Sequence, residues 1–231
     1  MSIAENVARI KEEITKAAIA AGRNPEEITL CAATKMNDAA AVQEAIQAGV
    51  DCCGENRVQE LTLKQSQNAY DGAPVHFIGH LQTNKVKQVV GKVDLIQSVD
   101  SVRLLEAIHK EAAKLGIVQD ILLEINVAME ESKSGFTLEE VDTVLARAGD
   151  FSAIRVLGFM AIPPICQDST ENHKFFQKMY NLSVDIMRKK YDNVCVNILS
   201  MGMSGDFADA IACGSTMIRV GTAIFGARDY S

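Results

Sequence analysis

Eight short apolar runs recur along the chain, each of a length typical of a β-strand. Their centres are Leu30, Cys53, Phe77, Ile96, Leu123, Leu157, Ile198 and Val220. Runs without polar alternation are typical of parallel sheets, because helices cover both faces of such a sheet. The pattern therefore predicts eight buried, parallel strands.

Helical patterns separate these runs. The N-terminal segment 1–22 is amphipathic, with Ser2 and Glu5 as a capping box and Gly22 at its end. Weaker helical patterns occupy residues 39–48, 58–70 and 84–91. Patterns with recognisable ends occupy residues 101–116, 137–148, 175–186 and 207–214, and Thr137 and Glu140 form a second predicted capping box.

Strands that alternate with helices, without a linker rich in Pro, Gly or Ser, predict a single (β/α)8 barrel over residues 1–231. A length of 231 residues fits one such α/β barrel. The helix at residues 1–22 is an addition that we expect on the bottom or the flank of the barrel. A doubly wound open sheet is the alternative, although it would usually have fewer strands.

The formal net charge of −7 argues against general nucleic-acid binding, which needs a basic surface to neutralise phosphates. The N-terminus lacks the continuous apolar stretch of a signal peptide, and no run reaches the length of a membrane span. We therefore expect a cytoplasmic protein with neither a nucleic-acid nor a membrane partner.

The six cysteines show neither a CxxC pair nor zinc-ligand spacing, which fits a reducing cytosol. Cys31 and Cys195 lie in apolar runs, so we expect both to be small buried core residues. His76 and His80 share a strand face at even spacing, but no third histidine or acid completes a metal set. The sequence therefore predicts no metal site.

The first apolar run, Ile28–Lys35, ends in a lysine. The C-terminal strand ends form the functional face of a (β/α)8 barrel, so this amine is expected at the barrel mouth. A partly desolvated lysine can form a Schiff base with a carbonyl ligand. The alternative is a lysine that only extends its charge from a strand end into water.

Two turns rich in glycine and hydroxyl side chains follow the seventh and eighth strands, at Ser200–Gly205 and Gly221–Thr222. Barrels commonly bind phosphate at these two loops, where backbone N–H groups face the anion. The alternative is that Ser204 only caps a helix and the glycines only serve tight turns. Asp206 weakens the phosphate interpretation unless its side chain points away.

Arg219 lies on the eighth strand, where a charge that faces the interior needs a partner. A ligand heterocycle or carboxylate would supply that partner; the alternatives are a buried ion pair with an acid such as Glu124 and an outward-facing position. Asn56 follows the second strand and offers an amide at the same face. Pyridoxal 5′-phosphate (PLP) has an aldehyde, a phosphate and a ring nitrogen, which would use Lys35, the two loops and Arg219 in turn.

Six motifs run in order along nearly the whole chain: Ala33–Lys35, Gly54–Asn56, His76–Lys85, Ser132–Gly135, Leu199–Ser204 and Gly214–Gly226. On these motifs the chain closely resembles the pyridoxal phosphate homeostasis proteins. The resemblance implies a (β/α)8 barrel like the N-terminal domain of alanine racemase, the fold of type III PLP proteins. We expect no second β domain of the kind that the racemases carry, because 231 residues leave no room for it.

The resemblance also implies a role for each site residue. PLP would be held as a covalent aldimine on Lys35, with no catalytic residue beside it. Phosphate contacts would come from Ser200, Ser204, Gly221 and Thr222, while Asn56 would line the site and Arg219 would lie near the pyridine nitrogen. A permanent cation there would keep that nitrogen unprotonated and make the cofactor a weaker electron sink.

Family members bind PLP without an established catalytic activity and are thought to carry or buffer it, so PLP-dependent apo-enzymes are candidate recipients. One alternative is a racemase-like enzyme, which needs a base on each face of its substrate. None of the four tyrosines, at positions 70, 180, 191 and 230, lies at a predicted strand end. Another alternative is a sugar-phosphate barrel in which Lys35 is structural. Without a second domain, we expect a monomer.

Overall fold

The strands form a closed barrel in which sequence neighbours pair in order and every pair is parallel. The computed structural model describes residues 1–130, 133–164 and 169–226. The strands are β1 (Thr29–Ala33), β2 (Cys52–Glu55), β3 (Val75–Phe77), β4 (Leu95–Val99), β5 (Gln119–Glu124), β6 (Ile154–Met160), β7 (Val194–Ser200) and β8 (Met217–Val220). Each contains the residue on which a strand was predicted, so the (β/α)8 barrel is confirmed and the open sheet is wrong.

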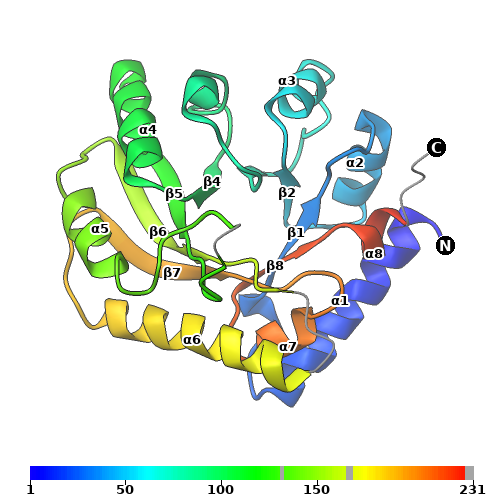
Figure 1. Ribbon diagram of the computed structural model, residues 1–231. Helices are drawn as coiled ribbons and strands as arrows, with labels where there is room; N and C mark the ends of the chain where they lie inside the picture. Colours follow the sequence, from blue (N-terminus) through cyan, green and yellow to red (C-terminus); the bar gives the residue numbers. More distant parts are fainter. Residues whose placement is uncertain (131–132, 165–168, 227–231) are drawn as a thin grey trace.

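Helices surround the ring of strands (Figure 1). They are α1 (Ile3–Ala20), α2 (Ala39–Gln47), α3 (Val58–Ser66), α4 (Val102–Leu115), α5 (Val141–Ala148), α6 (Ser169–Met187), α7 (Phe207–Ala212) and α8 (Thr222–Phe225), with 3₁₀ turns η1 (Pro25–Glu27) and η2 (Thr83–Gln88). The leader helix α1 lies on the flank of the barrel, against α2, α7 and α8. Its predicted capping box between Ser2 and Glu5 is formed. None of the described helices is long and apolar enough to cross a bilayer.

Four predicted helices differ from the observed ones, and one of them, α6, begins at Ser169 rather than at residue 175. The segment 84–91 forms the 3₁₀ turn η2 rather than an α-helix. The helix α3 stops before Tyr70, because Asn68 takes a left-handed backbone conformation with φ of 55°. Thr137 donates to the Glu140 carboxylate over 3.0 Å instead of accepting a helix N–H. The pair therefore closes a turn, and α5 begins only at Val141.

The seam between β7 and β8 is short, since the two strands pair only at Ser200 and Met217. The first half of β7 is therefore open on one side, and its alternate residues reach solvent. Cys195 is exposed there, so the prediction that it is buried was wrong. Cys31, on the well-paired β1, is fully buried as predicted.

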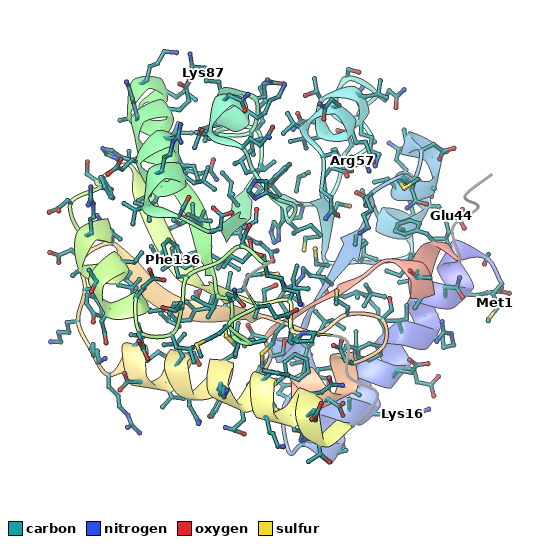
Figure 2. All side chains as sticks on the ribbon, viewed as in Figure 1. Met1, Lys16, Glu44, Arg57, Lys87 and Phe136 are labelled. Atoms are coloured by element: carbon teal, nitrogen blue, oxygen red, sulfur yellow. The ribbon has the colours of Figure 1, made fainter. Side chains whose placement is uncertain are left out.

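Side chains fill the space on both sides of the barrel wall (Figure 2). Leu30 and Ala32 point outward and pack with α1, whereas Cys53 and Phe77 point outward into the larger cluster under the other helices. Side chains alternate along a strand, so the residues between them face the barrel interior. That interior is partly polar, because His76, Gln97, Ser200 and Arg219 are all buried within it.

Candidate functional site

Lys35 lies two residues beyond the end of β1, half-buried in a turn at the C-terminal face of the barrel. The turn is fixed by hydrogen bonds to the backbone on both sides of the lysine. The Lys64 Nζ donates to the Thr34 carbonyl over 2.7 Å, and the Met36 N–H donates to the Glu60 carboxylate over 2.6 Å. Met36 has a φ of 62°, which few residues other than glycine adopt. The backbone that carries Lys35 is therefore held in one conformation.

A buried ion pair beneath this turn links β1, β2 and α3. The Lys64 Nζ lies 2.7 Å from the Glu55 Oε2, and both side chains are almost fully enclosed. Thr34 and Tyr70 each donate a hydroxyl to the same carboxylate oxygen over 3.0 Å. Burial and the adjacent Glu55 carboxylate raise the pKa of Tyr70, so that its hydroxyl remains a donor. Every charge in the cluster therefore has a partner, as buried charges require.

Asn56 follows β2 directly and is tied to the same cluster. Its backbone N–H donates to the Glu55 Oε1 over 3.0 Å. Its side-chain Oδ1 is buried but has no hydrogen-bond partner within the described residues. A buried acceptor without a donor costs about 1–3 kcal/mol unless a ligand or water supplies one. Asn56 therefore has an unused acceptor close to the barrel mouth.

Gly79 sets the position of Asn56, because a Cβ on Gly79 would lie 2.2 Å from the Asn56 carbonyl oxygen. We expect Gly79→Ala to displace Asn56 and weaken ligand binding, since neither backbone can yield easily. Gly149→Ala is the matched control, because its nearest contact is 3.3 Å and its backbone is helical. Isothermal titration of both variants with PLP, the expected ligand, measures the effect. Equal affinities of Gly79→Ala and Gly149→Ala for PLP would contradict the prediction.

Arg219 is buried in the barrel interior and heads a chain of hydrogen bonds. Its Nη1 donates to the Ser200 Oγ over 2.5 Å, and its Nη2 donates to the Ala161 carbonyl over 2.9 Å. The Ser200 Oγ then donates to the Gln97 Oε1 over 2.7 Å. Ser200 faces inward on β7 and is enclosed between these two side chains, so its hydroxyl is engaged by Arg219 and Gln97, and the phosphate contact stays a prediction.

Arg219 does not form the buried ion pair with Glu124 that was one alternative. Among the described residues, no carboxylate lies within ion-pair distance of its guanidinium. Burial and the nearby Asp100 raise the pKa of Glu124 to about 7, against the opposing effect of Arg219, which lowers it. The arginine is therefore held by neutral groups, which leaves its charge available to a ligand.

The loops after β7 and β8 lie against each other. The Ser204 Oγ accepts from the Ala223 N–H over 3.4 Å, so Ser204 bridges the loops instead of capping α7. Within the described residues, the N–H groups of Ser204, Gly205 and Thr222 donate to no protein acceptor. Such N–H groups at adjoining turns form a binding place for an anion.

Asp206 begins α7 and borders the same loops. Its Oδ1 accepts from the Met203 N–H over 2.6 Å, so the carboxylate is turned back onto its own loop. Burial raises the pKa of Asp206, while that hydrogen bond and the charge of Arg219 lower it. The carboxylate is therefore engaged within its own loop, and its electrostatic repulsion of a bound anion is reduced.

These elements enclose a cavity of about 390 Å³ at the C-terminal face. Its lining includes five predicted site residues: Lys35, Ser204, Arg219, Gly221 and Thr222. The other lining residues are Ala33, Asn172, Met203, Gly205 and Asp206. Two predicted site residues, Asn56 and Ser200, are not among the lining residues.

Asn172 is the lining residue that no pattern in the sequence indicated. It lies on α6 and is buried, and its amide faces Asp209 of α7 at 3.4 Å. No local motif marks it, because it reaches the cavity only through the packing of α6 on α7. The tyrosines at positions 70, 180 and 191 do not line the cavity. Ser132 of the Ser132–Gly135 motif, Tyr230, and Cys166, which is one of the six cysteines, lie outside the described residues.

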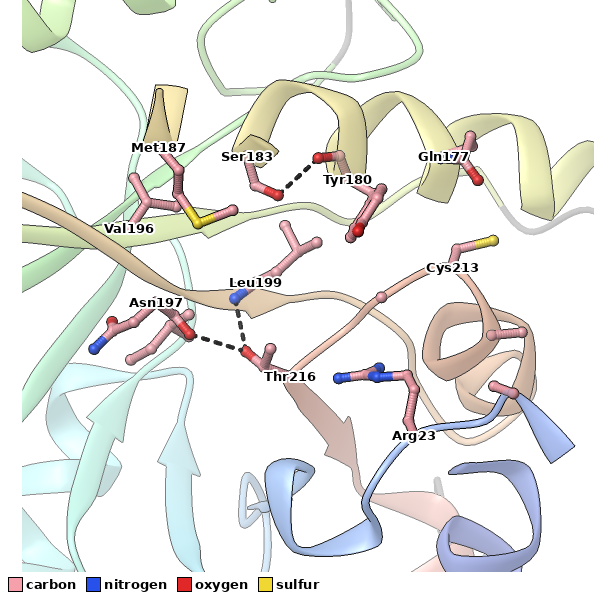
Figure 3. Close-up of a pocket in the computed structure, with 14 residues that line it drawn as sticks. Arg23, Gln177, Tyr180, Ser183, Met187, Val196, Asn197, Leu199, Cys213 and Thr216 are labelled. Atoms are coloured by element: carbon pink, nitrogen blue, oxygen red, sulfur yellow. Dashed lines mark hydrogen bonds between the residues drawn. The ribbon is translucent and has the colours of Figure 1, made fainter. Parts of the chain in front are cut away.

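A second cavity of about 520 Å³ lies between α6 and the open seam of β7 and β8 (Figure 3). Arg23, Tyr180, Asn197 and Thr216 are among its lining residues. Arg23 donates there to the Ser215 carbonyl over 2.6 Å, so its charge is used structurally. None of the predicted site residues lines this cavity, which leaves the barrel mouth as the candidate site.

Comparison with known proteins places the chain in a family. The family model described as "Alanine racemase, N-terminal domain" matches residues 2–229. A relative from Aquifex aeolicus named "Pyridoxal phosphate homeostasis protein" is 40% identical over 230 residues, covering 100% of both chains. The match therefore extends over the whole barrel.

Solved structures agree with this placement. The structure of PipY from Synechococcus elongatus with PLP bound has a TM-score of 0.84 and 30% identity, covering 97% of this chain and 100% of that one. An alanine racemase from Clostridium difficile has a TM-score of 0.71 at 15% identity, covering 98% of this chain and 61% of that one, which shows the shared fold alone. The chain therefore belongs to the family of pyridoxal phosphate homeostasis proteins, which have the fold of the alanine racemase N-terminal domain.

Proposed function

We propose that the protein binds PLP at the barrel mouth and serves the homeostasis of this cofactor in the cell. The observation that carries the proposal is the single cavity that gathers an amine, a permanent cation and unused N–H donors. A cavity of 390 Å³ lies within the range of small-ligand sites. PLP supplies a chemical partner for each of the three groups.

Lys35 is the group that we assign to the PLP aldehyde. Its amine condenses with the aldehyde to form a Schiff base, with loss of one water molecule. The rigid turn around Lys35 supports this role, because a fixed backbone brings the amine to the same place in each molecule. Asn56, which follows β2 at the same face of the barrel, supplies an acceptor that lacks a partner within the described residues.

The phosphate is assigned to the two loops after β7 and β8. The N–H groups of Ser204, Gly205 and Thr222, with the hydroxyls of Ser204 and Thr222, form a neutral cradle for it. In this assignment the Ser200 hydroxyl holds Arg219 in place.

Removing one hydroxyl from the cradle tests the phosphate assignment. We expect Ser204→Ala to weaken PLP binding about 10- to 150-fold, because a hydrogen bond to a charged group contributes about 1.5–3 kcal/mol. Binding of pyridoxal, which has no phosphate, is expected to be unchanged. Ser66→Ala is the control, since that exposed hydroxyl only donates to the Leu63 carbonyl. Equal losses for PLP and pyridoxal in fluorescence titrations would refute the assignment.

Arg219 is assigned to the pyridine nitrogen. A guanidinium has only donors, so the nitrogen that faces it must act as an acceptor and remain unprotonated. PLP then withdraws fewer electrons from an attached amino acid. This arrangement favours holding the cofactor over using it in catalysis.

A racemase-like activity is the second candidate, supported by the fold shared with alanine racemase. Proton removal on both faces of a substrate needs two bases, and no described tyrosine lines the cavity to serve as the second. Incubation of the PLP-loaded protein with L-alanine in D2O separates the two functions. We expect negligible exchange of the α-proton, and rapid exchange with formation of D-alanine would favour the racemase.

We further propose that the protein acts as a monomer in the cytosol and delivers PLP to PLP-dependent apo-enzymes. All the groups assigned to PLP come from one chain, so no second copy is needed to complete the site. The five described cysteines are free thiols, as is usual in a reducing compartment. Sedimentation velocity of the loaded protein tests the monomer.

A further inference from the structure

Three inward-facing side chains from neighbouring strands converge just below the PLP cavity. They are Cys31 of β1, Cys52 of β2 and His76 of β3, and all three are buried. Their thiol and imidazole atoms lie within 4.8 Å of one another, and the Cys52 Sγ is 3.5 Å from the His76 Nδ1. Ligands of a trigonal ion with bonds of about 2.3 Å are about 4 Å apart, so the cluster is close to the required spacing.

The hydrogen-bond chain from Arg219 determines which atom of His76 is available. Arginine has only donors, so the Ser200 hydroxyl accepts a hydrogen bond from it. The same hydroxyl donates its hydrogen bond to the Gln97 Oε1. The Gln97 amide nitrogen must then face His76, and it lies 2.9 Å from the Nδ1. This donor fixes the Nδ1 as the unprotonated ring nitrogen, which is the state that a metal ligand needs, and a bound ion would take the lone pair that now accepts from Gln97.

The ligand set determines the class of metal. Two thiolates and an imidazole form a soft set, and Met217 belongs to the same buried cluster as the two cysteines. Soft sulfur ligands with fewer than four donors suit Cu(I), whereas a structural zinc site usually has four ligands. We propose that Cys31, Cys52 and His76 form a buried binding site for Cu(I).

The charges and the route of entry are consistent with such a site. Cu(I) displaces one proton from each thiol, and the resulting bis-thiolate complex has a net charge of −1. Arg219, the register partner of Cys31 on β8, supplies a compensating positive charge. Cys31 lies on the same strand face as Ala33, which lines the PLP cavity. We therefore expect the ion to enter through the barrel mouth.

Titration of the reduced protein with Cu(I), under nitrogen and in the presence of bicinchoninate, tests the site. We expect the wild-type protein to withdraw one equivalent of copper from this coloured chelator. Cys31→Ser and Cys52→Ser are each expected to lower the affinity at least about 100-fold, because loss of a second-shell group alone costs about 10–100-fold. Cys195→Ser, which removes an exposed thiol, is the control and is expected to match the wild type.

X-ray absorption of the wild-type copper complex keeps the test independent of whether the core variants fold. We expect two sulfur neighbours and one nitrogen neighbour around copper. Three results would overturn the site: no withdrawal of copper by the wild type, withdrawal that depends on Cys195 but not on Cys31, or displacement of the copper by an equal concentration of zinc.

Discussion

Lys35→Ala is expected to abolish the covalent attachment of PLP completely, while the barrel remains folded. The half-buried amine lies at the barrel mouth and, in the proposed site, is the group that condenses with the aldehyde. Its removal leaves the phosphate cradle and Arg219 intact, so weak noncovalent binding is expected to persist. The absorbance band of the protonated Schiff base, recorded during titration with PLP, measures the loss.

Two control variants distinguish condensation from loss of charge. Lys35→Arg keeps a cation at the site but cannot condense, so it is also expected to lack the band. Lys133→Ala removes a lysine of the loop after β5, which pairs with Glu130 at 2.7 Å, and is expected to keep it. A band of wild-type intensity in Lys35→Ala would show that another amine holds the aldehyde.

Among the substitutions proposed for this protein, Lys64→Met is expected to cause the largest loss of stability. The expected loss is about 3–5 kcal/mol in the free energy of unfolding. The substitution leaves the fully buried Glu55 carboxylate without its cation and the Thr34 carbonyl without the Lys64 donor. The Thr34 carbonyl directly precedes Lys35, so PLP binding is expected to weaken as well. Urea unfolding followed by circular dichroism measures the first effect, and titration with PLP measures the second.

Two further variants show whether the loss comes from the unpaired charge. The double variant Lys64→Met with Glu55→Gln removes both charges and is expected to recover much of the stability, because the desolvated carboxylate is gone. Lys16→Met breaks an exposed pair with Glu12 and is expected to leave the unfolding curve unchanged. An equally small effect of Lys64→Met and Lys16→Met would contradict the role of the buried pair.

The barrel could be predicted from the sequence because its strands are continuous apolar runs separated by turns. The ends of α3 and the 3₁₀ form of η2 could not be, since they depend on single backbone conformations such as that of Asn68. The exposure of Cys195 was missed for a different reason. It follows from the short pairing of β7 with β8, and strand pairing is not visible in an apolar run.

The candidate site was predictable where a residue lies at a strand end. Lys35, Ser204 and Thr222 line one cavity because parallel strands bring their C-terminal ends to one face. Ser200 is enclosed because it lies one layer of side chains below the rim of the barrel. The sequence does not show whether an inward-facing residue lies at the rim or below it.

Residues that separate helices or strands bring together at a site could not be identified from a pattern in the sequence. Asn172 depends on the packing of one helix on another. The cluster of Cys31, Cys52 and His76 draws one residue from each of three strands, so the spacing along the chain suggested no metal site.

Borohydride reduction of the PLP-loaded protein, followed by peptide mass spectrometry, tests whether Lys35 holds PLP as a Schiff base. Reduction converts a Schiff base into a stable secondary amine, so the modified lysine can be located. We expect one pyridoxyl phosphate group per chain, attached to Lys35. Attachment to a different lysine, or a chain that stays unmodified while saturated with PLP, would contradict it.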